Sequence, residues 1–314
     1  CALPICSSPS FHETILQRPP YTLIANSDFF LMDSRSQYIL TIRDVTELQR
    51  LEKNIRYKLS KTGLTATHHF EDIKTVDEGM KHVIRQAEVM ARYNAPILIQ
   101  GESGTGKELF AQSIHNASDR RHGPFVAINC AALPTDLLES ELFGYVGGSF
   151  TGARKEGKAG LFEMAHNGTI FLDEINSMAP SIQSKLLRVL ETKQVMRLGS
   201  DYVIPLDIRI ISASNADIIA AVQAGSFRRD LFFRINPLRL SLPPLNERPD
   251  DILYLFAYFL ENFTHRRQPL KASLKKALIQ HDWWGNIREL HSVALRYYIF
   301  GDTLDDDYDK IGRA

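Results

Sequence analysis

The sequence predicts an α/β fold in which helices cover a parallel β-sheet, with a small helical domain after it. Three short apolar segments, residues 95–100, 168–174 and 208–215, have the composition of buried strands. Nearly continuous apolar strands are typical of a parallel sheet that is covered on both faces. Helical periodicity replaces these strands after Pro243 and Pro244, and this change predicts the helical domain.

Composition limits the kind of protein more than it defines a function. The chain has 314 residues, 44% of them hydrophobic, which is enough for a sizeable core and about two domains. Lys plus Arg and Asp plus Glu number 37 each, so charge gives no argument for a nucleic-acid or membrane partner. Three scattered cysteines and the lack of a long apolar run favour a cytoplasmic protein. Because the chain begins at Cys1 rather than Met, we interpret it as a fragment.

The amino-terminal region predicts strands followed by a helix. Residues 1–20 are rich in Pro and Ser, and we expect an irregular chain there. Residues 21–26 and 38–43 are predicted strands, the second with β-branched residues at alternate positions. A helical period follows, carried by Val45, Leu48, Leu51, Ile55 and Leu59. An ordinary surface helix and a connector that dimerises both fit this pattern.

A glycine-rich stretch, G-E-S-G-T-G-K-E, follows the first predicted strand at residues 101–108. The spacing of Gly101, Gly106 and Lys107 is that of a phosphate-binding loop. Glycines let successive backbone N–H groups turn inward around phosphate, the lysine meets the terminal phosphates, and the following helix adds its positive end. Glycine and lysine are common residues, so this spacing alone is weak evidence and needs support from the sequence downstream.

Two carboxylates end the second predicted strand, G-T-I-F-L-D-E. Asp173 is placed to hold Mg²⁺ through its waters, and Glu174 to activate an attacking water. The metal needs such ligands because Glu108 stands where a phosphate-binding loop normally has Ser or Thr. The alternative is a solvated strand end, which does not explain paired acids after a buried strand downstream of a phosphate loop.

Further polar residues follow the third predicted strand. Asn215 can orient water or the terminal phosphate, although asparagine at such a place is also a common turn residue. Arg228, Arg229 and Arg234 lie around a predicted helix start in F-R-R-D-L-F-F-R. Arginines stabilise charge on a transferred phosphoryl group and can come from a neighbouring subunit, whereas the alternative is a solvated helix face.

The helical domain is predicted to open with a helix capped by Asp250 and Asp251. The apolar side of this helix carries Ile252, Leu255, Phe256, Phe259, Leu260 and Phe263.

Residues 70–295 resemble the AAA+ domain of bacterial enhancer-binding proteins, the ATPases that activate RNA polymerase carrying sigma-54. The matching words are G-E-S-G-T-G-K-E, F-V-A-I-N-C-A-A-L, E-S-E-L-F-G-Y, G-S-F-T-G-A, G-K-A-G-L-F-E-M-A, G-T-I-F-L-D-E-I, L-L-R-V-L-E, F-R-R-D-L-F-F-R and W-W-G-N-I-R-E-L. In this family Glu is the usual residue at position 108. The resemblance implies a P-loop AAA+ ATPase with a helical lid, and ATP and Mg²⁺ as cofactors.

The resemblance also implies a role for each matching residue at the nucleotide. The residues expected to hold the nucleotide are Gly101, Glu102, Ser103, Gly104, Thr105, Gly106, Lys107, Glu108 and Arg288. Among these, Lys107 binds the phosphates, and Arg288 of N-I-R-E-L touches the nucleotide within its own subunit. Asp173 holds magnesium and Glu174 is the general base.

Three kinds of auxiliary residue are implied as well. Asn129 holds Glu174 away from water until the sigma factor is contacted, and Asn215 senses the terminal phosphate. Arg228 and Arg234 are implied to reach the nucleotide of a neighbouring subunit. Contacts of this kind imply a homo-oligomeric ring, which is usually a hexamer in this family.

A phenylalanine stands among glycines in G-Y-V-G-G-S-F-T-G-A. By resemblance, the sigma-54 factor is contacted by a loop that comprises Gly148, Ser149, Phe150, Thr151, Gly152 and Ala153. An exposed ring between glycines suits a mobile arm that buries the ring only in its partner, and the alternative is a ring that folds back onto its own core. Departures from the family pattern are Ser149 for Ala, Trp284 for Pro and Asn246 for Arg.

The amino-terminal segment Y-I-L-T-I-R-D-V-T-E-L-Q resembles the last strand of a PAS sensor domain and its signalling helix, with Asp44 and Thr46 in the D-x-T positions. We therefore predict a partial PAS-like segment at 1–45, a helical linker at 46–69, an α/β nucleotide-binding subdomain at 70–242 and a helical lid at 243–314. Family members continue into a helix-turn-helix, so we expect DNA binding only through a carboxyl-terminal domain that this chain lacks.

Three functions remain open from the sequence. The first is an activator that hydrolyses ATP and remodels closed promoter complexes of sigma-54 RNA polymerase to open ones. The second is an ATPase that regulates transcription without sigma-54 contact, against which the intact F-T-G-A argues. The third is a nucleotide-dependent sensor or scaffold without turnover, against which Glu174, Arg228 and Arg234 argue.

Overall fold

The computed structural model describes residues 11–18, 21–32, 35–44, 64–148, 156–266 and 269–301. The chain divides into two compact units, residues 1–63 and 64–314. Within the described residues, no helix combines the length and the apolar character needed to cross a membrane.

The described part of the first unit is an antiparallel sheet of three strands in the order β1-β2-β3. Its strands are β1 (Phe11–Arg18), β2 (Tyr21–Met32) and β3 (Arg35–Asp44). The strands predicted at residues 21–26 and 38–43 are confirmed as parts of β2 and β3. The helix predicted after residue 44 lies outside the described residues, and the PAS assignment stays a prediction.

The expectation of an irregular chain up to residue 20 is wrong for β1. Residues Thr14 to Arg18 pair in register with Ala25 to Tyr21 of β2. The prolines of this region stand on either side of F-H-E-T-I-L-Q-R, which itself contains none. Strand formation depends on the neighbouring strand more than on local propensity, so composition alone could not reveal it.

The second unit is built on a parallel sheet, of which the described residues form five strands in the order β12-β4-β11-β8-β5. These strands are β4 (Ile97–Gln100), β5 (Phe125–Asn129), β8 (Thr169–Asp173), β11 (Arg209–Ser214) and β12 (Leu238–Ser241). The three predicted buried strands are confirmed as β4, β8 and β11, each slightly shorter than predicted. The parallel α/β fold is confirmed with them.

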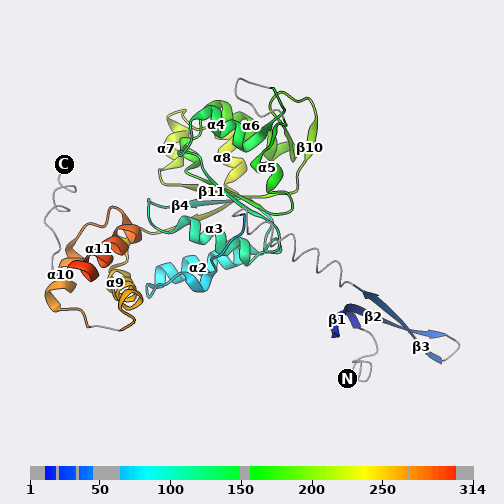
Figure 1. Cartoon of the computed structure of the whole chain (residues 1–314), viewed down its shortest axis with the longest axis horizontal. Helices are drawn as coiled ribbons and strands as arrows, with labels where there is room; N and C mark the ends of the chain where they lie inside the picture. The colour runs from blue at the N-terminus through cyan, green and yellow to red at the C-terminus, as the bar shows by residue number, and fades with distance from the viewer. Residues whose placement is uncertain are drawn as a thin grey trace. The chain divides into compact units, whose positions relative to one another are not determined.

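Apolar side chains of the strands alternate between two hydrophobic cores. Along β4, Ile97 and Ile99 belong to one core and Leu98 belongs to the other. The first core is covered by α2 (Glu78–Ala91) and α3 (Lys107–Asn116), and the second by α4 to α8, so Figure 1 shows a layer of helices on each side of the sheet. Because both faces are covered, consecutive apolar residues occur in β4, β8 and β11.

The second layer contains most of the remaining elements. Its helices are α4 (Thr135–Phe143), α5 (Leu161–Met164), α6 (Pro180–Thr192), α7 (Ile218–Gln223) and α8 (Arg229–Ile235), with the 3-10 turn η3 (Ile175–Ser177). Two short antiparallel hairpins are β6 (Gly144–Tyr145) with β7 (Lys158–Ala159), and β9 (Gln194–Met196) with β10 (Val203–Pro205). The helix start predicted beside Arg228 is confirmed, since this residue is the N-cap of α8.

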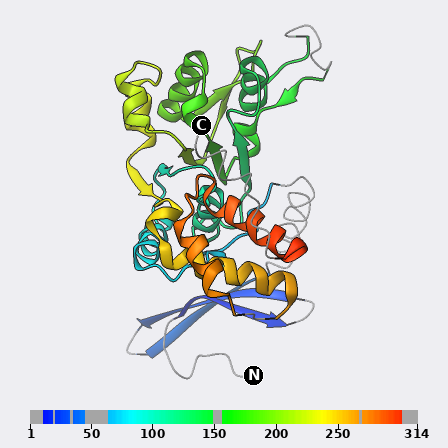
Figure 2. The same ribbon diagram turned by 90° about the vertical axis from the view of Figure 1, so that its left-hand side faces the viewer.

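The predicted helical lid has a core of its own. After the 3-10 turn η4 (Leu245–Glu247) come α9 (Pro249–Thr264), α10 (Ala272–Gln280) and α11 (Asn286–Phe300). Figure 2 shows these helices, coloured from gold to red, gathered into one cluster. Phe256, Trp283 and Leu290 are buried at its centre.

The first turn of α9 differs from the prediction. The helix begins at Pro249 and Arg248 is its N-cap, so Asp251 lies within the first turn and does not cap it. The Asp251 carboxylate is buried and instead accepts hydrogen bonds from Thr75 Oγ1 at 2.7 Å and from Val76 N at 2.7 Å. It thereby ties the lid to the segment before α2, a long-range role that a local capping pattern cannot reveal.

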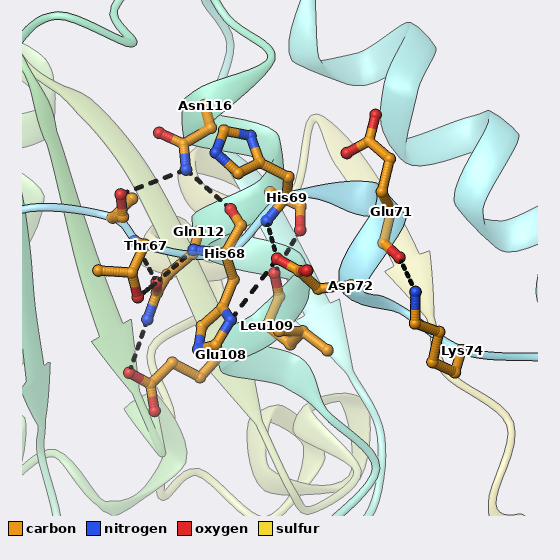
Figure 3. Close-up of polar contacts among 12 residues, drawn as sticks. Thr67, His68, His69, Glu71, Asp72, Lys74, Glu108, Leu109, Gln112 and Asn116 are labelled. Atoms are coloured by element: carbon orange, nitrogen blue, oxygen red, sulfur yellow. Dashed lines mark hydrogen bonds and ion pairs between the residues drawn. The ribbon is translucent and has the colours of Figure 1, made fainter. Parts of the chain in front are cut away.

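The last residues of the predicted linker pack against α3. Residues 64–69, predicted as the end of a helical linker, are not helical. Gln112 Oε1 accepts the backbone N–H groups of Thr67 at 2.9 Å and His68 at 3.3 Å, and Asn116, one turn later on α3, donates to His68 O at 2.7 Å, as Figure 3 shows. The second compact unit therefore includes these residues, ahead of the boundary predicted at 70.

The buried side chain of His115 should make the stability of the fold depend on pH. It is buried on α3 with its Nδ1 2.9 Å from Thr169 Oγ1, and burial, followed by the charge of Arg209, lowers its pKa to about 4. The unfolded chain, with a histidine pKa of about 6.5, therefore takes up this proton first as the pH falls. The free energy of unfolding should decrease by up to about 3 kcal/mol from pH 6.5 towards pH 4.

Urea unfolding at several pH values checks this expectation. His115→Gln keeps a polar side chain facing Thr169 but does not titrate, so the difference in stability between wild type and variant should shrink as the pH falls. A difference that stays constant over this range would show that His115 is not the responsible group.

Candidate active site

The parallel register brings the polar residues of separate strands to one edge of the sheet. Asn129, the last residue of β5, is paired with Asp173, the last residue of β8. Gln100, which ends β4 just before the glycine-rich loop, is paired with Ser214 of β11. In open parallel sheets, ligands bind beyond this carboxyl edge. The loop and the acids predicted from the sequence therefore lie where a ligand is expected.

The glycine-rich loop turns from β4 into α3. Gly104 and Gly106 have φ angles of 80° and 100°, a left-handed backbone that favours glycine. Thr105 Oγ1 donates to Glu102 O at 2.8 Å and closes the turn. Gly106 is the N-cap of the ten-residue helix α3, so the loop ends at the positive end of a helix dipole.

Lys107 is the first residue of α3 and is buried, with 8% of its surface exposed. Its Nζ donates to the carbonyl oxygens of Gly101 at 2.8 Å and Glu102 at 2.9 Å. Burial lowers the pKa of Lys107, and the nearby carboxylates of Asp173 and Glu174 oppose this shift. A buried ammonium group held by neutral carbonyls would gain a stronger, charge-assisted partner from a phosphate.

A cavity of about 700 Å³ lies next to this loop. That volume is within the usual range for small-molecule sites. Its lining includes ten residues that were predicted for the site, namely Ser103, Gly104, Thr105, Gly106, Lys107, Glu108, Asn129, Asp173, Glu174 and Arg288, and further polar residues, namely Asp72, Lys74, Arg248, His291 and Ser292. A second group of lining residues is apolar or aromatic and comprises Ile73, Met80, Leu255, Tyr258 and Phe259. The sequence did not reveal the second group, because its members come from distant segments that carry no motif.

The two acids are held side by side at the end of β8. Glu174 has a φ of 51°, which is uncommon for a residue with a side chain, and its N–H donates to Asp173 Oδ1 at 2.9 Å. In the described ranges, no three or more His, Cys, Asp or Glu side chains gather into a metal site. Mg²⁺ does not need such a group, because one or two carboxylates with phosphate and water oxygens usually hold it. The donor atoms present fit this metal.

Asn129 and Glu108 line the same cavity with defined partners. Asn129 Oδ1 accepts the N–H of Ala131 at 2.8 Å. The hydrogen bonds of the described residues do not include one from Asn129 to Glu174, so the switch role of Asn129 stays a prediction. Glu108 Oε1 accepts Gln112 Nε2 at 3.1 Å, which links this carboxylate to the residue that holds the segment before α2, as drawn in Figure 3.

The lid contacts the glycine-rich loop directly. Arg288, a predicted site residue, donates from Nη1 to Ser103 Oγ at 3.0 Å. Asn286, which the sequence analysis did not single out, is fully buried and donates from Nδ2 to Glu102 Oε2 at 3.0 Å. Its φ of 52° is a conformation that asparagine tolerates better than most residues, and the Gly-Asn pair at the start of α11 is the signal that could have indicated it.

Gly101 and Glu102 are not part of the cavity lining, although their carbonyl oxygens accept from Lys107 Nζ, and three further predicted residues also lie outside the lining. Asn215 follows β11 and is exposed. Arg228 is exposed and bonded to Asp230 Oδ2 at 2.7 Å, a contact that lowers the pKa of that carboxyl. Arg234 is exposed and donates to Leu190 O at 3.3 Å. Within one chain, the structure does not bring these side chains to the cavity lining.

The predicted sigma-contact loop falls largely outside the described residues. Gly148 is described, exposed and at a φ of 79°, whereas Ser149, Phe150, Thr151, Gly152 and Ala153 are outside the described ranges. The strands β6 and β7 flank this loop in the chain and pair with each other. Lys158 of β7 forms an ion pair with Glu141 of α4 at 2.5 Å, so the described base of the loop is tied to a helix.

Comparison with known proteins identifies two domains. Residues 73–241 match the Sigma-54 interaction domain and residues 246–306 match the AAA+ ATPase lid domain. The transcriptional activator RocR of Bacillus subtilis is 46% identical over 80% of this chain and 54% of its own length. The regulatory protein AtoC of Escherichia coli is 44% identical over 82% of this chain and 56% of its own.

A solved structure agrees with these matches. NtrX from Brucella abortus in complex with ATP superposes with a TM-score of 0.68 at 31% identity, over 83% of this chain and 58% of NtrX. The chain thus spans about half the length of the curated relatives it matches. Because the first domain match covers more than half of the 314 residues, the chain belongs to the Sigma-54 interaction domain family.

Proposed function

We propose that this chain hydrolyses ATP and uses the hydrolysis to activate RNA polymerase carrying sigma-54. ATP-dependent activation of sigma-54 is the function of the family to which it belongs. The observation that carries the proposal is that Lys107, Asp173 and Glu174 line one cavity together with Arg288 of the lid. The ATP complex of NtrX supports the choice of nucleotide.

The cavity offers positively charged groups for the phosphates of the nucleotide and apolar side chains for its adenine ring. The backbone N–H groups of the loop and the positive end of α3 receive the phosphates. Lys107 exchanges its carbonyl partners for phosphate oxygens, and Arg288 adds a second positive charge from the lid. Lining residues of α2 and α9, among them Met80 and Tyr258, provide an apolar and aromatic surface for the adenine ring of the nucleotide.

Hydrolysis requires a base beside the terminal phosphate. Glu174 takes a proton from a water molecule as the water oxygen attacks the γ-phosphorus, the bond from that phosphorus to the β-phosphate oxygen breaks, and ADP and phosphate result. Mg²⁺, when bound, neutralises charge on the phosphate oxygens. Asp173 would hold it, partly through water, and Asn129 would restrain Glu174 until sigma-54 is engaged.

Arg228 and Arg234 act on the nucleotide of a neighbouring subunit in this proposal. Both are exposed at α8 and neither belongs to the lining of its own cavity, which suits arginines supplied from a second copy. A homo-oligomeric ring, hexameric by family resemblance, follows from such contacts. The loop at residues 148–153 then carries the motion to sigma-54, and Asn215 senses the terminal phosphate.

A pair of variants separates binding from chemistry. Lys107→Ala should weaken ATP binding by about 100-fold, because charge-assisted bonds to phosphate are lost. Glu174→Gln should bind ATP as wild type does and hydrolyse it about 100-fold or more slowly, because the base is lost. Calorimetric titration with ATP and a phosphate-release assay measure the two effects. Tight ATP binding by Lys107→Ala, or normal turnover by Glu174→Gln, would contradict the assigned role.

Mixing inactive variants tests the role of Arg234 between subunits. Arg234→Ala and Lys107→Ala should each be inactive alone, but their mixture should regain part of the ATPase rate. The regained sites combine an intact Lys107 of one subunit with Arg234 of the next. As a control, a mixture of Lys107→Ala with Glu174→Gln should stay inactive, because both residues act within one subunit. Absence of rescue at every ratio would show that Arg234 does not act between subunits.

A further inference from the structure

Asn286 joins three parts of the second unit through one buried side chain. Its Nδ2 donates to Glu102 Oε2 at 3.0 Å and to Ser103 O at 3.1 Å, both in the glycine-rich loop. Its Oδ1 accepts the N–H of Leu245, in the turn η4 that leads into the lid, at 2.6 Å. The neighbouring residue Ile287 donates its backbone N–H to Gly104 O at 3.1 Å. Two consecutive carbonyl groups of the loop are therefore held by the start of α11.

Holding these carbonyl groups fixes the direction of the N–H groups that follow them. A trans peptide is planar, and its C=O and N–H point in opposite directions. With the carbonyls of Ser103 and Gly104 directed at the lid, the N–H groups of Gly104 and Thr105 are directed away from it. These N–H groups belong to the part of the loop that lines the cavity. A rotation of the Ser103–Gly104 peptide would withdraw one of them from a bound phosphate.

The lid side of this contact is firmly supported. Glu289 accepts the N–H of Gly285 at 2.8 Å and pairs with His281 at 2.8 Å. Asn246 Oδ1 accepts the N–H of the buried Trp283 at 3.0 Å. The two chain segments also approach closely, since a Cβ on Gly104 would lie 2.1 Å from Gly285 O. The turn before α11 therefore presents the Asn286 amide to the loop in a fixed position.

We propose that Asn286 is a positioning residue that sets the Ser103–Gly104 peptide plane and thereby the affinity of the loop for a nucleoside diphosphate or triphosphate. The inference rests on the proposed nucleotide site and adds a residue that acts through the loop rather than by touching the nucleotide. It also gives the lid a route to the phosphates that is independent of Arg288.

The test compares Asn286→Asp with wild type in the full chain, using ADP with Mg²⁺ as the probe. Aspartate keeps the oxygen that accepts from Leu245 and tolerates the positive φ, but it replaces the Nδ2 donor with an oxygen facing Glu102 and Ser103. Calorimetry should give about tenfold weaker ADP binding per folded molecule, the amount that one lost charge-assisted bond accounts for. The ATPase assay should show a raised KM with a nearly unchanged kcat, because Asp173 and Glu174 are untouched.

Two matched variants make the result specific. Asn246→Asp adds the same charge near the lid turn and keeps the acceptor for Trp283, without a described contact to the loop, so its ADP affinity should equal that of wild type. Asn286→Asp combined with Glu102→Gln should recover part of the affinity, because the amide introduced at position 102 can donate to the carboxylate introduced at position 286. A purely structural role would reduce the number of binding sites and leave their affinity unchanged.

The possible outcomes separate the role of Asn286 from the proposed nucleotide site. Wild-type affinity in Asn286→Asp, or equal losses in Asn246→Asp and Asn286→Asp, would overturn the inference. If Asn286→Asp does not fold, Asn286→Gly, which keeps the positive φ, carries the same expectation of about tenfold weaker binding. Failure of the wild-type chain to bind ADP would overturn the proposed function, whereas wild-type binding with an unaffected Asn286→Asp variant would overturn this inference alone.

Discussion

The parallel register of the central sheet is the constraint on which the site depends. It places the end of β4, where the glycine-rich loop begins, the end of β8, where the two acids lie, and Asn129 of β5 at one edge. A shift of one residue in any of these pairings would turn each side chain of the strand towards the other hydrophobic core, where it does not fit. Since both faces are covered by helices, the hydrophobic cores enforce the register that the chemistry needs.

Burial on both faces also determines how charged groups behave near the sheet. Arg209 of β11 is buried next to the carboxyl end of α2. It donates hydrogen bonds at 2.9 Å to the carbonyl oxygens of Met90 and Ala91, the last two residues of that helix, where carbonyl groups lack partners within the helix. Its pKa is lowered to about 10, chiefly by burial. Cys130, beside Asn129, has its pKa raised to about 12 by burial and by the two acids, so it stays a neutral thiol next to the site. Lys107, in contrast, is buried where an anion can replace its carbonyl partners.

Much of the site could be predicted because its residues lie in short continuous motifs of the sequence. The loop after β4 and the acids after β8 each follow a strand whose apolar residues mark it as buried, and the parallel sheet then brings them together. The prediction weakened where structure depends on partners far along the chain. Strand β1 needs β2, and the segment at residues 64–69 needs polar groups on α3.

The lid contact shows the same limit within the site. Arg288 was predicted through the resemblance of N-I-R-E-L to the family's lid motif. Asn286 was not singled out, because its partners are the Glu102 carboxylate, the Ser103 carbonyl and the turn η4, and no local pattern connects these groups to it. Likewise Asp251 has the sequence position of a helix cap, yet its carboxylate accepts hydrogen bonds from Thr75 and Val76. In each case a buried polar group finds its partner across the fold, where periodicity carries no information.

In the proposed function, ATP hydrolysis in this cavity is coupled to sigma-54 through the loop at residues 148–153. The most direct measurement compares wild type with Thr151→Ala, scoring ATPase rate and open-complex formation on a sigma-54 promoter at high protein concentration. High concentration removes the need for tethering to the promoter DNA. The account predicts that both proteins hydrolyse ATP at similar rates and that only wild type opens the promoter. Wild-type protein that hydrolyses ATP yet opens no promoter, under conditions in which a known sigma-54 activator does, would contradict it.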